Sequence, residues 1–251
     1  MASLAERYVE FLNETLKKIY PGEMENVRRA AELVAKKISE GGVVHVFGTG
    51  AHSILMVEDI FFRAGGLAPL NAIFDFGLFF GSGARRALRF EHLSGYAGVL
   101  LDYHGVGEGD LVVIFNDYGI NHLSIEAAME CRSRGATVIA FTCPQLSDSA
   151  APDNPARHPS GKNLYEIADV VIDTHVPVGL CVLEAEDLPA KICHIQTVTN
   201  SLLINLLVAT VVEILLERGE VPPIWTSVKA PGAAEFNKRW FEEYGDKIKH
   251  L

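Results

Sequence analysis

The eight residues VFGTGAHS, from Val46 to Ser53, set the interpretation of the whole chain. They begin in an apolar run, residues 43–47, that is typical of a buried strand, and they lead into a segment with helical spacing. Gly48 and Gly50 allow a tight turn and a close approach of the backbone to a ligand, and the amides at the start of the next helix point toward an anion. Because Ser53 is also a good helix N-cap, a plain strand-to-helix turn is the alternative interpretation. The pattern predicts a phosphate-binding loop made of Gly48, Thr49, Gly50, His52 and Ser53.

Four more short apolar runs repeat this plan farther along the chain. They lie at Leu70–Phe74, Leu111–Phe115, Val138–Phe141 and Val170–Ile172. Segments with helical spacing separate most of them, at Ser53–Arg63, Arg85–Tyr103 and His122–Arg134. Short strands that alternate with helices require right-handed crossovers and place helices on both faces of a parallel sheet. We therefore expect an α/β fold, a three-layer αβα sandwich around a five-stranded parallel sheet.

Helices flank this core at both ends of the chain. Two helices separated by Pro21-Gly22 are expected within residues 1–40, packed on the core. Residues 41–220 form the main domain, which closes with a long apolar helix, Ile195–Arg218. Residues 221–251 form a tail with a short helix. A helix this apolar is usually buried in a core or in an interface, so we expect a homodimer or a homotetramer.

Composition argues against several classes of protein. The chain has 251 residues, 49% hydrophobic and 22% charged, as is ordinary for a folded domain. Its formal net charge of −10 argues against a nucleic-acid partner, which requires a basic surface. The four cysteines lack metal-finger or C-x-x-C spacing and no leader pattern begins the chain, so we expect reduced thiols and a cytoplasmic location. The most apolar run, Ser201–Leu216, contains Asn205 and Glu213, and we expect it to be too short and too polar to span a membrane.

A second loop, FNDYGIN at residues 115–121, also follows a strand and precedes a helix. Because parallel strands end at one edge of a sheet, both loops should meet where ligands bind in open α/β sheets. With these two loops the chain resembles the sugar isomerase (SIS) domain family. Members of that family have a first loop like G-x-G-x-S and a hydroxyl-rich second loop. A helix follows, and then a strand like GATVIAFT at residues 135–142. Residues 157–165 and Pro222-Pro223-Ile224 are similar to a bacterial branch of these proteins.

The resemblance implies a flavodoxin-like SIS fold that binds a small phosphorylated sugar and isomerises it, or carries out a related lyase or deglycase reaction. The family's second loop usually offers serines or threonines to phosphate. This chain instead has Asn116, Tyr118, Gly119 and Asn121 there. Side-chain amides, a phenol and backbone amides can also donate to phosphate, although asparagine is equally a common turn residue.

Sugar isomerisation needs a base that removes a proton next to a carbonyl. Related proteins carry catalytic glutamates in the region of Glu91, at or near the start of a helix, so Glu91 is the first candidate for the base and His92 could assist it. Because family members can use a histidine from a late helix, His194 is a third catalytic candidate. Lys162 could neutralise the charge of the substrate. Each of these side chains also fits an ordinary surface or core position.

Two other functions stay open. The altered second loop fits a non-catalytic phosphosugar sensor, although no helix-turn-helix pattern precedes Gly41. Gly48 and Gly50 also fit a dinucleotide-dependent oxidoreductase, but Ser53 replaces the third glycine of that fingerprint. The histidines show no H-x-x-x-H or H-E-x-x-H spacing, so we expect no metal site and no cofactor.

Overall fold

A computed structural model describes residues 2–251 of the chain. At its centre is a five-stranded sheet in which all neighbouring strands are parallel, in the order β2-β1-β3-β4-β5. The strands are β1 (Val44–Gly48), β2 (Leu70–Ile73), β3 (Leu111–Phe115), β4 (Thr137–Thr142) and β5 (Val170–Asp173). All five predicted strands are present in the flavodoxin-like order, so the expected fold class is confirmed.

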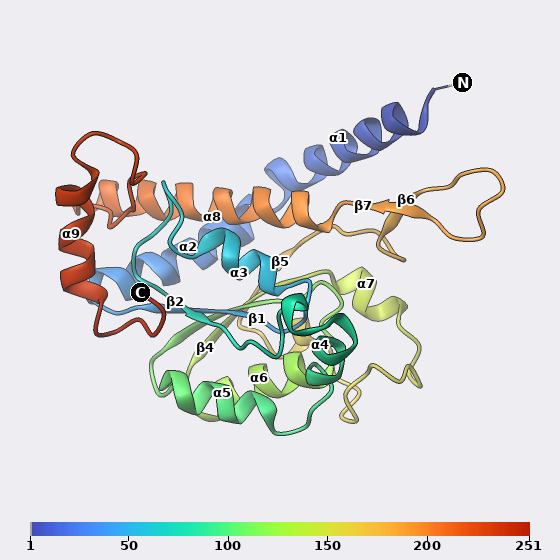
Figure 1. Ribbon diagram of the computed structural model, residues 1–251, viewed down its shortest axis with the longest axis horizontal. Helices are drawn as coiled ribbons and strands as arrows, with labels where there is room; N and C mark the ends of the chain where they lie inside the picture. Colours follow the sequence, from blue (N-terminus) through green and yellow to red (C-terminus); the bar gives the residue numbers. More distant parts are fainter. Residues whose placement is uncertain (1) are drawn as a thin grey trace.

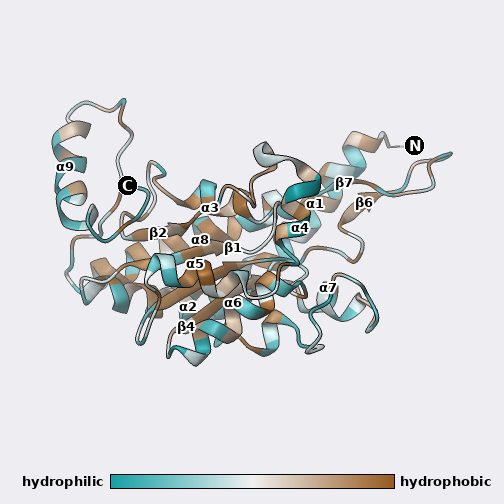
Figure 2. Cartoon of the chain, turned by 60° about the horizontal axis from the view of Figure 1, so that its bottom comes forward, coloured by the Kyte–Doolittle hydropathy of each residue, from teal (hydrophilic) through white to brown (hydrophobic). Residues whose placement is uncertain are grey.

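Helices cover both faces of the sheet and form the outer layers of the sandwich (Figure 1). The helices are α2 (Met24–Ser39), α3 (Ile54–Ile60) and α8 (Gln196–Glu217) on one face, and α5 (Tyr96–His104) and α6 (His122–Ser133) on the other. Successive side chains of a strand point to opposite faces of the sheet. Val113 therefore lies in the hydrophobic core beneath α2, α3 and α8, the first core, whereas Val112 and Ile114 lie in the second core, beneath α5 and α6. Because both faces are buried, the strands carry the continuous apolar runs that Figure 2 shows through the middle of the molecule.

α8 is the predicted long apolar helix. It packs along α2 in the first core and buries Leu203, Leu207 and Val211 at a spacing of four residues. By length and composition alone its 22 residues, which extend beyond the apolar run Ser201–Leu216, could cross a membrane, a test that core helices of soluble proteins also pass. The helix is mostly buried inside the protein, as is typical of a core helix.

The two N-terminal helices are α1 (Leu4–Gly22) and α2, and the helical backbone breaks at Tyr20, next to Pro21, as the sequence predicts. α1 extends away from the sheet, beside an antiparallel hairpin of β6 (Cys181–Leu183) and β7 (Ile192–His194) (Figure 1). No pattern in the sequence predicts this hairpin, because each strand has only three residues. We call α1 and the hairpin the arm.

The prediction of one helix over Arg85–Tyr103 is wrong. The chain instead forms α4 (Ala84–Phe90) and α5, with a turn at residues 91–95 between them. Gly95 has a φ of +78°, a left-handed conformation that interrupts a helix and that glycine adopts without strain. The interruption places Glu91 at the end of α4, where its side chain can turn toward the sheet edge.

The chain after α8 packs beside β2. It contains α9 (Ala233–Tyr244), and its aromatic residues Trp225, Trp240 and Tyr244 pack against Ala68 beside β2. The remaining short elements are α7 (Pro144–Ser149) and the 3-10 turns η1 (Phe80–Ser82) and η2 (Leu164–Glu166).

Candidate active site

A cavity of about 330 Å³ lies at the carboxyl ends of β1 and β3, where the two predicted loops meet. Its volume suits a small organic ligand. Both loops contribute to its wall, together with the α4–α5 turn, the segment after α7 and the start of α8. The lining residues are Gly50, Ala51, His52, Ser53, Leu88, Glu91, His92, Asn116, Asp117, Tyr118, Ile120, Asn121, Asn154, Ala156, Leu180 and Gln196.

The two glycines of the first loop serve different purposes. A Cβ atom on Gly48 would lie 2.5 Å from the carbonyl oxygen of Ser53, so only glycine lets β1 pass so close to the start of α3. A Cβ atom on Gly50 would lie 3.0 Å from Nδ2 of Asn116 and 3.4 Å from Oγ of Ser53. Gly50 therefore keeps space open between the two loops, inside the cavity.

Thr49 supports the site from within the protein. Its fully buried hydroxyl lies 2.6 Å from Oγ of Ser124, and its carbonyl oxygen accepts hydrogen bonds from Nδ2 of Asn116 and Asn121 at 3.1 and 3.0 Å. The Thr49 side chain is therefore turned away from the cavity and already has its partners.

The second loop is stabilised by the two asparagines that were expected to bind phosphate. Oδ1 of Asn116 accepts from the amide of Gly119 at 2.8 Å, and Oδ1 of Asn121 caps α6 by accepting from the amide of Ser124 at 2.8 Å. Gly119 has a φ of +55° and leaves no room for a Cβ atom, which would lie 2.7 Å from Oγ1 of Thr142. Both asparagines line the cavity, but their main contacts are those of turn and capping residues.

The first loop leaves several donors for a ligand. Ser53 occupies the N-cap position of α3, yet its hydroxyl makes no capping hydrogen bond. Within residues 2–251, the backbone N–H groups of Gly50, His52 and Ser53 have no protein acceptor. The His52 ring lies edge-on to Phe80 with 4.7 Å between centroids, and desolvation lowers its pKa. The loop thus offers three amides and one hydroxyl at the cavity wall.

Glu91 is held tightly at the centre of this arrangement. Its carboxylate accepts from the backbone N–H of Ala51 at 2.6 Å and from Nδ2 of Asn121 at 3.3 Å. Its own carbonyl oxygen accepts from the amide of Leu123 at 3.0 Å, which fixes the turn to the start of α6. Burial raises the pKa of the Glu91 carboxyl, and the two hydrogen bonds offset only part of that effect. Glu91 was expected at or near the start of a helix; it instead follows the last turn of α4 as its C-cap, five residues before α5 begins at Tyr96.

His92 lies at the exposed mouth of the cavity. Its ring centroid is 5.9 Å from that of His122, which in turn is 5.2 Å from that of His158. Desolvation and the neighbouring His122 ring lower the pKa of His92. In the part of the chain from residue 2 onward, no group of three or more His, Cys, Asp or Glu side chains has a geometry that could hold a metal ion.

Two predicted site residues lie elsewhere. His194 is exposed on β7 and directly precedes Ile195, the N-cap of α8. Its carbonyl oxygen accepts from the hydroxyl of Tyr8 in α1 at 3.0 Å, which ties the arm together. Lys162 is exposed in the loop before η2. Neither side chain is part of the cavity lining drawn from residues 2–251.

The structure also adds Asp117 and Gln196 to the cavity. The carboxyl of Asp117 accepts from Nδ2 of Asn200 at 3.0 Å, and burial raises its pKa. Asn200 lies one turn after Gln196 in α8, and its Nδ2 also donates to the Gln196 carbonyl at 2.9 Å. The one signal in the sequence is that Asp117 stands between Asn116 and Tyr118. Nothing in the sequence places α8 against this loop.

Comparison with known proteins supplies the family. A sequence model of the SIS domain matches residues 7–143. A UPF0309 protein of Geobacillus thermodenitrificans is 34% identical over 98% of this chain and 96% of its own. Another UPF0309 protein, from Caldanaerobacter subterraneus, is also 34% identical, over 99% of this chain and 100% of its own.

Solved structures agree on the fold. A phosphoheptose isomerase from Francisella tularensis superposes with a TM-score of 0.54 at 18% identity, covering 85% of this chain and 100% of its own. A phosphoheptose isomerase from Neisseria gonorrhoeae gives 0.52 at 17% identity, covering 84% and 98%. At such low identity these likenesses concern the fold alone.

Proposed function

Since the chain belongs to the SIS domain family, within its UPF0309 group, we propose that it binds a phosphorylated sugar and isomerises it, or carries out a related lyase or deglycase reaction, by acid–base chemistry. The observation that carries the proposal is Glu91, a carboxyl with a raised pKa that lies between two glycine loops at the carboxyl edge of a parallel sheet. The phosphoheptose isomerases that share the fold support a sugar phosphate as the ligand.

The chemistry follows from how Glu91 is held. Each carboxylate oxygen has one donor, the Ala51 amide or the Asn121 side chain, so the group is oriented before a ligand arrives. Partial burial raises its pKa above the ordinary glutamate value, which makes the ionised carboxylate a stronger base. Glu91 is therefore suited to remove a proton from the carbon next to a sugar carbonyl.

The anionic end of the ligand needs donors other than lysine or arginine. Among residues 2–251, neither residue type lines the cavity. The free amides of Gly50, His52 and Ser53 and the Ser53 hydroxyl are the donors that the protein itself does not use. We assign the phosphate to this loop, with the phenol of Tyr118 as a donor from the opposite wall.

The other predicted residues have lesser roles in this proposal. His92 can contact a ligand at the mouth of the cavity. Lys162 reaches a ligand only if its loop moves or if a second copy supplies it. His194 is outside the cavity lining but lies near enough to the cavity residue His52 to lower the pKa of that ring. We also propose a homodimer or homotetramer in the cytoplasm, with no nucleic-acid partner, no membrane attachment and no cofactor.

A phosphosugar sensor without catalysis is the second candidate. The observation in its favour is that Asn116 and Asn121 are engaged with the protein, where the related loops usually offer hydroxyls to phosphate. A sensor needs affinity for the ligand but no turnover.

A thermal-shift screen tests both candidates. Sugar phosphates of five to seven carbons are compared with the free sugars and with inorganic phosphate, because a ligand of the native state raises the unfolding midpoint by mass action. We expect selective stabilisation by a sugar phosphate, followed by its conversion in a turnover assay. Binding without conversion over long incubation identifies a sensor. No shift with any phosphorylated sugar overturns the phosphosugar proposal.

A further inference from the structure

Four carboxyl and imidazole groups in the cavity lining could act as acids or bases. They are the carboxyls of Glu91 and Asp117 and the rings of His52 and His92. Aldose–ketose isomerisation needs a base for the carbon-bound proton and an acid for the carbonyl oxygen. Glu91 meets the first need. The second group has to be protonated at working pH and has to face the same ligand.

The histidines do not meet the second need. Desolvation lowers the pKa of both His52 and His92, so each ring is neutral at physiological pH. The third predicted histidine, His194, is exposed on the arm and outside the cavity lining.

Asp117 is fixed by its backbone and by one neutral donor. Its carbonyl oxygen accepts from the amide of Cys143 at 3.0 Å and from Oγ1 of Thr142 at 3.2 Å. Its carboxyl accepts from Nδ2 of Asn200 at 3.0 Å, and Asn200 is only 3% exposed. Within residues 2–251, no lysine or arginine forms an ion pair with Asp117.

The charged surroundings of Asp117 favour a proton on it. Asp173, at the end of β5, is a further carboxyl near it, and burial is the largest cause of the raised pKa of Asp117. A half-buried carboxyl that lies near another acid and has one side-chain amide as its donor is favoured as the neutral acid. Glu91, by contrast, has a backbone N–H and an amide as donors, which favour its ionised form.

We propose that Asp117 is the general acid that pairs with Glu91 as the base, the two acting from opposite loops on one ligand. The inference rests on the proposed function and names a residue that the sequence did not single out. It assigns different roles to two carboxyls because their environments differ.

The proton transfers balance without a cofactor. Glu91 removes the proton from C2 of the open-chain aldose while Asp117 donates its proton to the oxygen at C1, which gives an enediol. Glu91 then returns its proton to C1, and Asp117 takes back the proton of the oxygen at C2. The product is the ketose, and both carboxyls end in their starting states.

The first test needs no ligand. Carbon-13 NMR of the full-length protein with labelled Asp and Glu carboxyls follows each group through a pH titration, and the D117N and E91Q variants assign the two signals. We expect the Asp117 carboxyl to titrate above the ordinary aspartate range and above Glu91. An Asp117 carboxyl that titrates in the ordinary range overturns the inference, whether or not a sugar phosphate binds.

The second test uses the sugar phosphate that gives the largest thermal shift. D117N should lower kcat at least about 100-fold, keep the shift with that ligand, and lose the decline of rate at high pH that reports the acid. D173N is the matched control, because Asp173 lies at the same sheet edge but outside the cavity lining. It should keep both limbs of the pH profile, with the high-pH limb moved to lower pH because the negative charge that raises the pKa of Asp117 is gone. Turnover by D117N at the wild-type rate overturns the inference while the proposed function stands, whereas absence of any ligand for the wild type rejects the proposed function itself. Because D117N removes a buried acid, an unfolding midpoint at or above that of the wild type confirms that the variant is folded.

Discussion

At the scale of single residues, the cavity depends on a glycine without a side chain and on uncharged hydrogen-bond donors. Gly50 provides space, the Ala51 amide orients Glu91, and Asn121 joins Glu91 to the second loop. In the proposed phosphate site, the amides and hydroxyl of the first loop take the place of basic side chains. Substitutions here should therefore affect the ligand more than the fold.

Glu91→Gln tests the base directly. The variant keeps an acceptor for the Ala51 amide but loses the carboxylate, so kcat should fall by about 100- to 10,000-fold while ligand binding changes little. In the wild type the rate should fall as the pH drops through the raised pKa of Glu91, because protonation removes the base. Steady-state kinetics across pH and calorimetric binding measure both. Normal turnover by Glu91→Gln would show that another group is the base.

Gly50→Ala tests the space in the cavity. The added methyl group would press on Asn116 and Ser53 at 3.0 and 3.4 Å, so the neighbouring side chains must shift. We expect a loss of ligand-induced thermal shift, with unfolding free energy reduced by about 1–3 kcal/mol. Gly81→Ala is the control, because nothing lies near a Cβ atom at Gly81. Equal ligand shifts in Gly50→Ala and the wild type would contradict the role given to Gly50.

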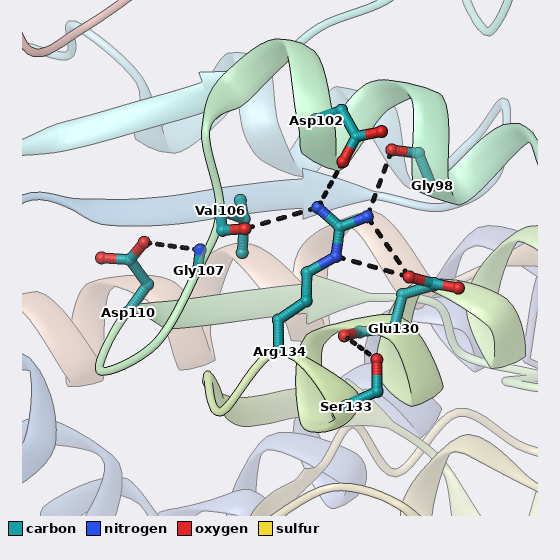
Figure 3. Close-up of polar contacts among 8 residues, drawn as sticks. All are labelled: Gly98, Asp102, Val106, Gly107, Asp110, Glu130, Ser133 and Arg134. Carbon is teal, nitrogen blue, oxygen red and sulfur yellow. Dashed lines mark hydrogen bonds and ion pairs between the residues drawn. The ribbon is translucent and has the colours of Figure 1, made fainter.

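At the scale of elements, the interruption between α4 and α5 makes the site possible. A continuous helix would keep Glu91 in a regular turn, whereas the turn at residues 91–95 brings it to Ala51 and anchors it to α6 through the Leu123 amide. The far end of the α5–α6 pair is held by one side chain, Arg134 (Figure 3).

Arg134 joins α5, the turn that follows it and α6. Its guanidinium contacts Asp102 at 2.7 Å and Glu130 at 3.2 Å and donates to the Val106 carbonyl at 3.4 Å. Because the side chain is only 20% exposed, we expect Arg134→Met to reduce unfolding free energy by about 1–2 kcal/mol. Asp102→Ala should cost less than about 1 kcal/mol, because Asp102 is 74% exposed and the other contacts remain. Urea denaturation of both variants measures the difference, and equal effects would contradict this prediction.

At the scale of the whole molecule, the arm and the outer face of α8 present apolar side chains to solvent. Val9 in α1 is 54% exposed, and Leu55 in α3 and Val198 in α8 are each 40% exposed. Apolar surface of this extent usually marks an interface. We therefore expect a homodimer or homotetramer at micromolar concentration by light scattering, and a shift toward monomer in Val9→Glu. A monodisperse wild-type monomer would contradict the prediction.

Stability should fall on mild acidification. Burial lowers the pKa of His104 to about 4, and both of its ring nitrogens are buried without a partner within residues 2–251. Because the unfolded chain binds a proton near pH 6.5 and the folded protein does not, stability is lost as the pH falls from about 7 toward 5. The lowered pKa values of His45 and His250 also reduce stability as the pH falls, whereas the raised pKa of His175 beside Glu23 increases it.

Unfolding midpoints at pH 7.5, 6.5 and 5.5 measure this effect. We expect a progressive fall in the wild type and a shallower fall in His104→Leu, which removes the most strongly shifted of these histidines. A midpoint that stays constant or rises between pH 7.5 and 5.5 would contradict the prediction.

The sequence by itself determined the fold class, the five strands and both loops of the cavity. These features are local, since a buried parallel strand needs a continuous apolar run and a loop that approaches a ligand or a helix needs glycine. The sequence also pointed to Glu91, through the resemblance to the SIS family. The close approach at Gly48 is likewise local, because a Cβ atom there would meet the backbone of Ser53 in the same loop.

Only the tertiary structure decided which polar groups face the ligand. Thr49 and Ser53 are both hydroxyl residues of one loop, yet Thr49 is buried against Ser124 while Ser53 faces the cavity. Asp117 gained its importance from Asn200, which lies 83 residues away in the chain. Hydrogen-bond partners and burial set the charge and direction of a side chain, and both depend on packing between elements that are distant in sequence.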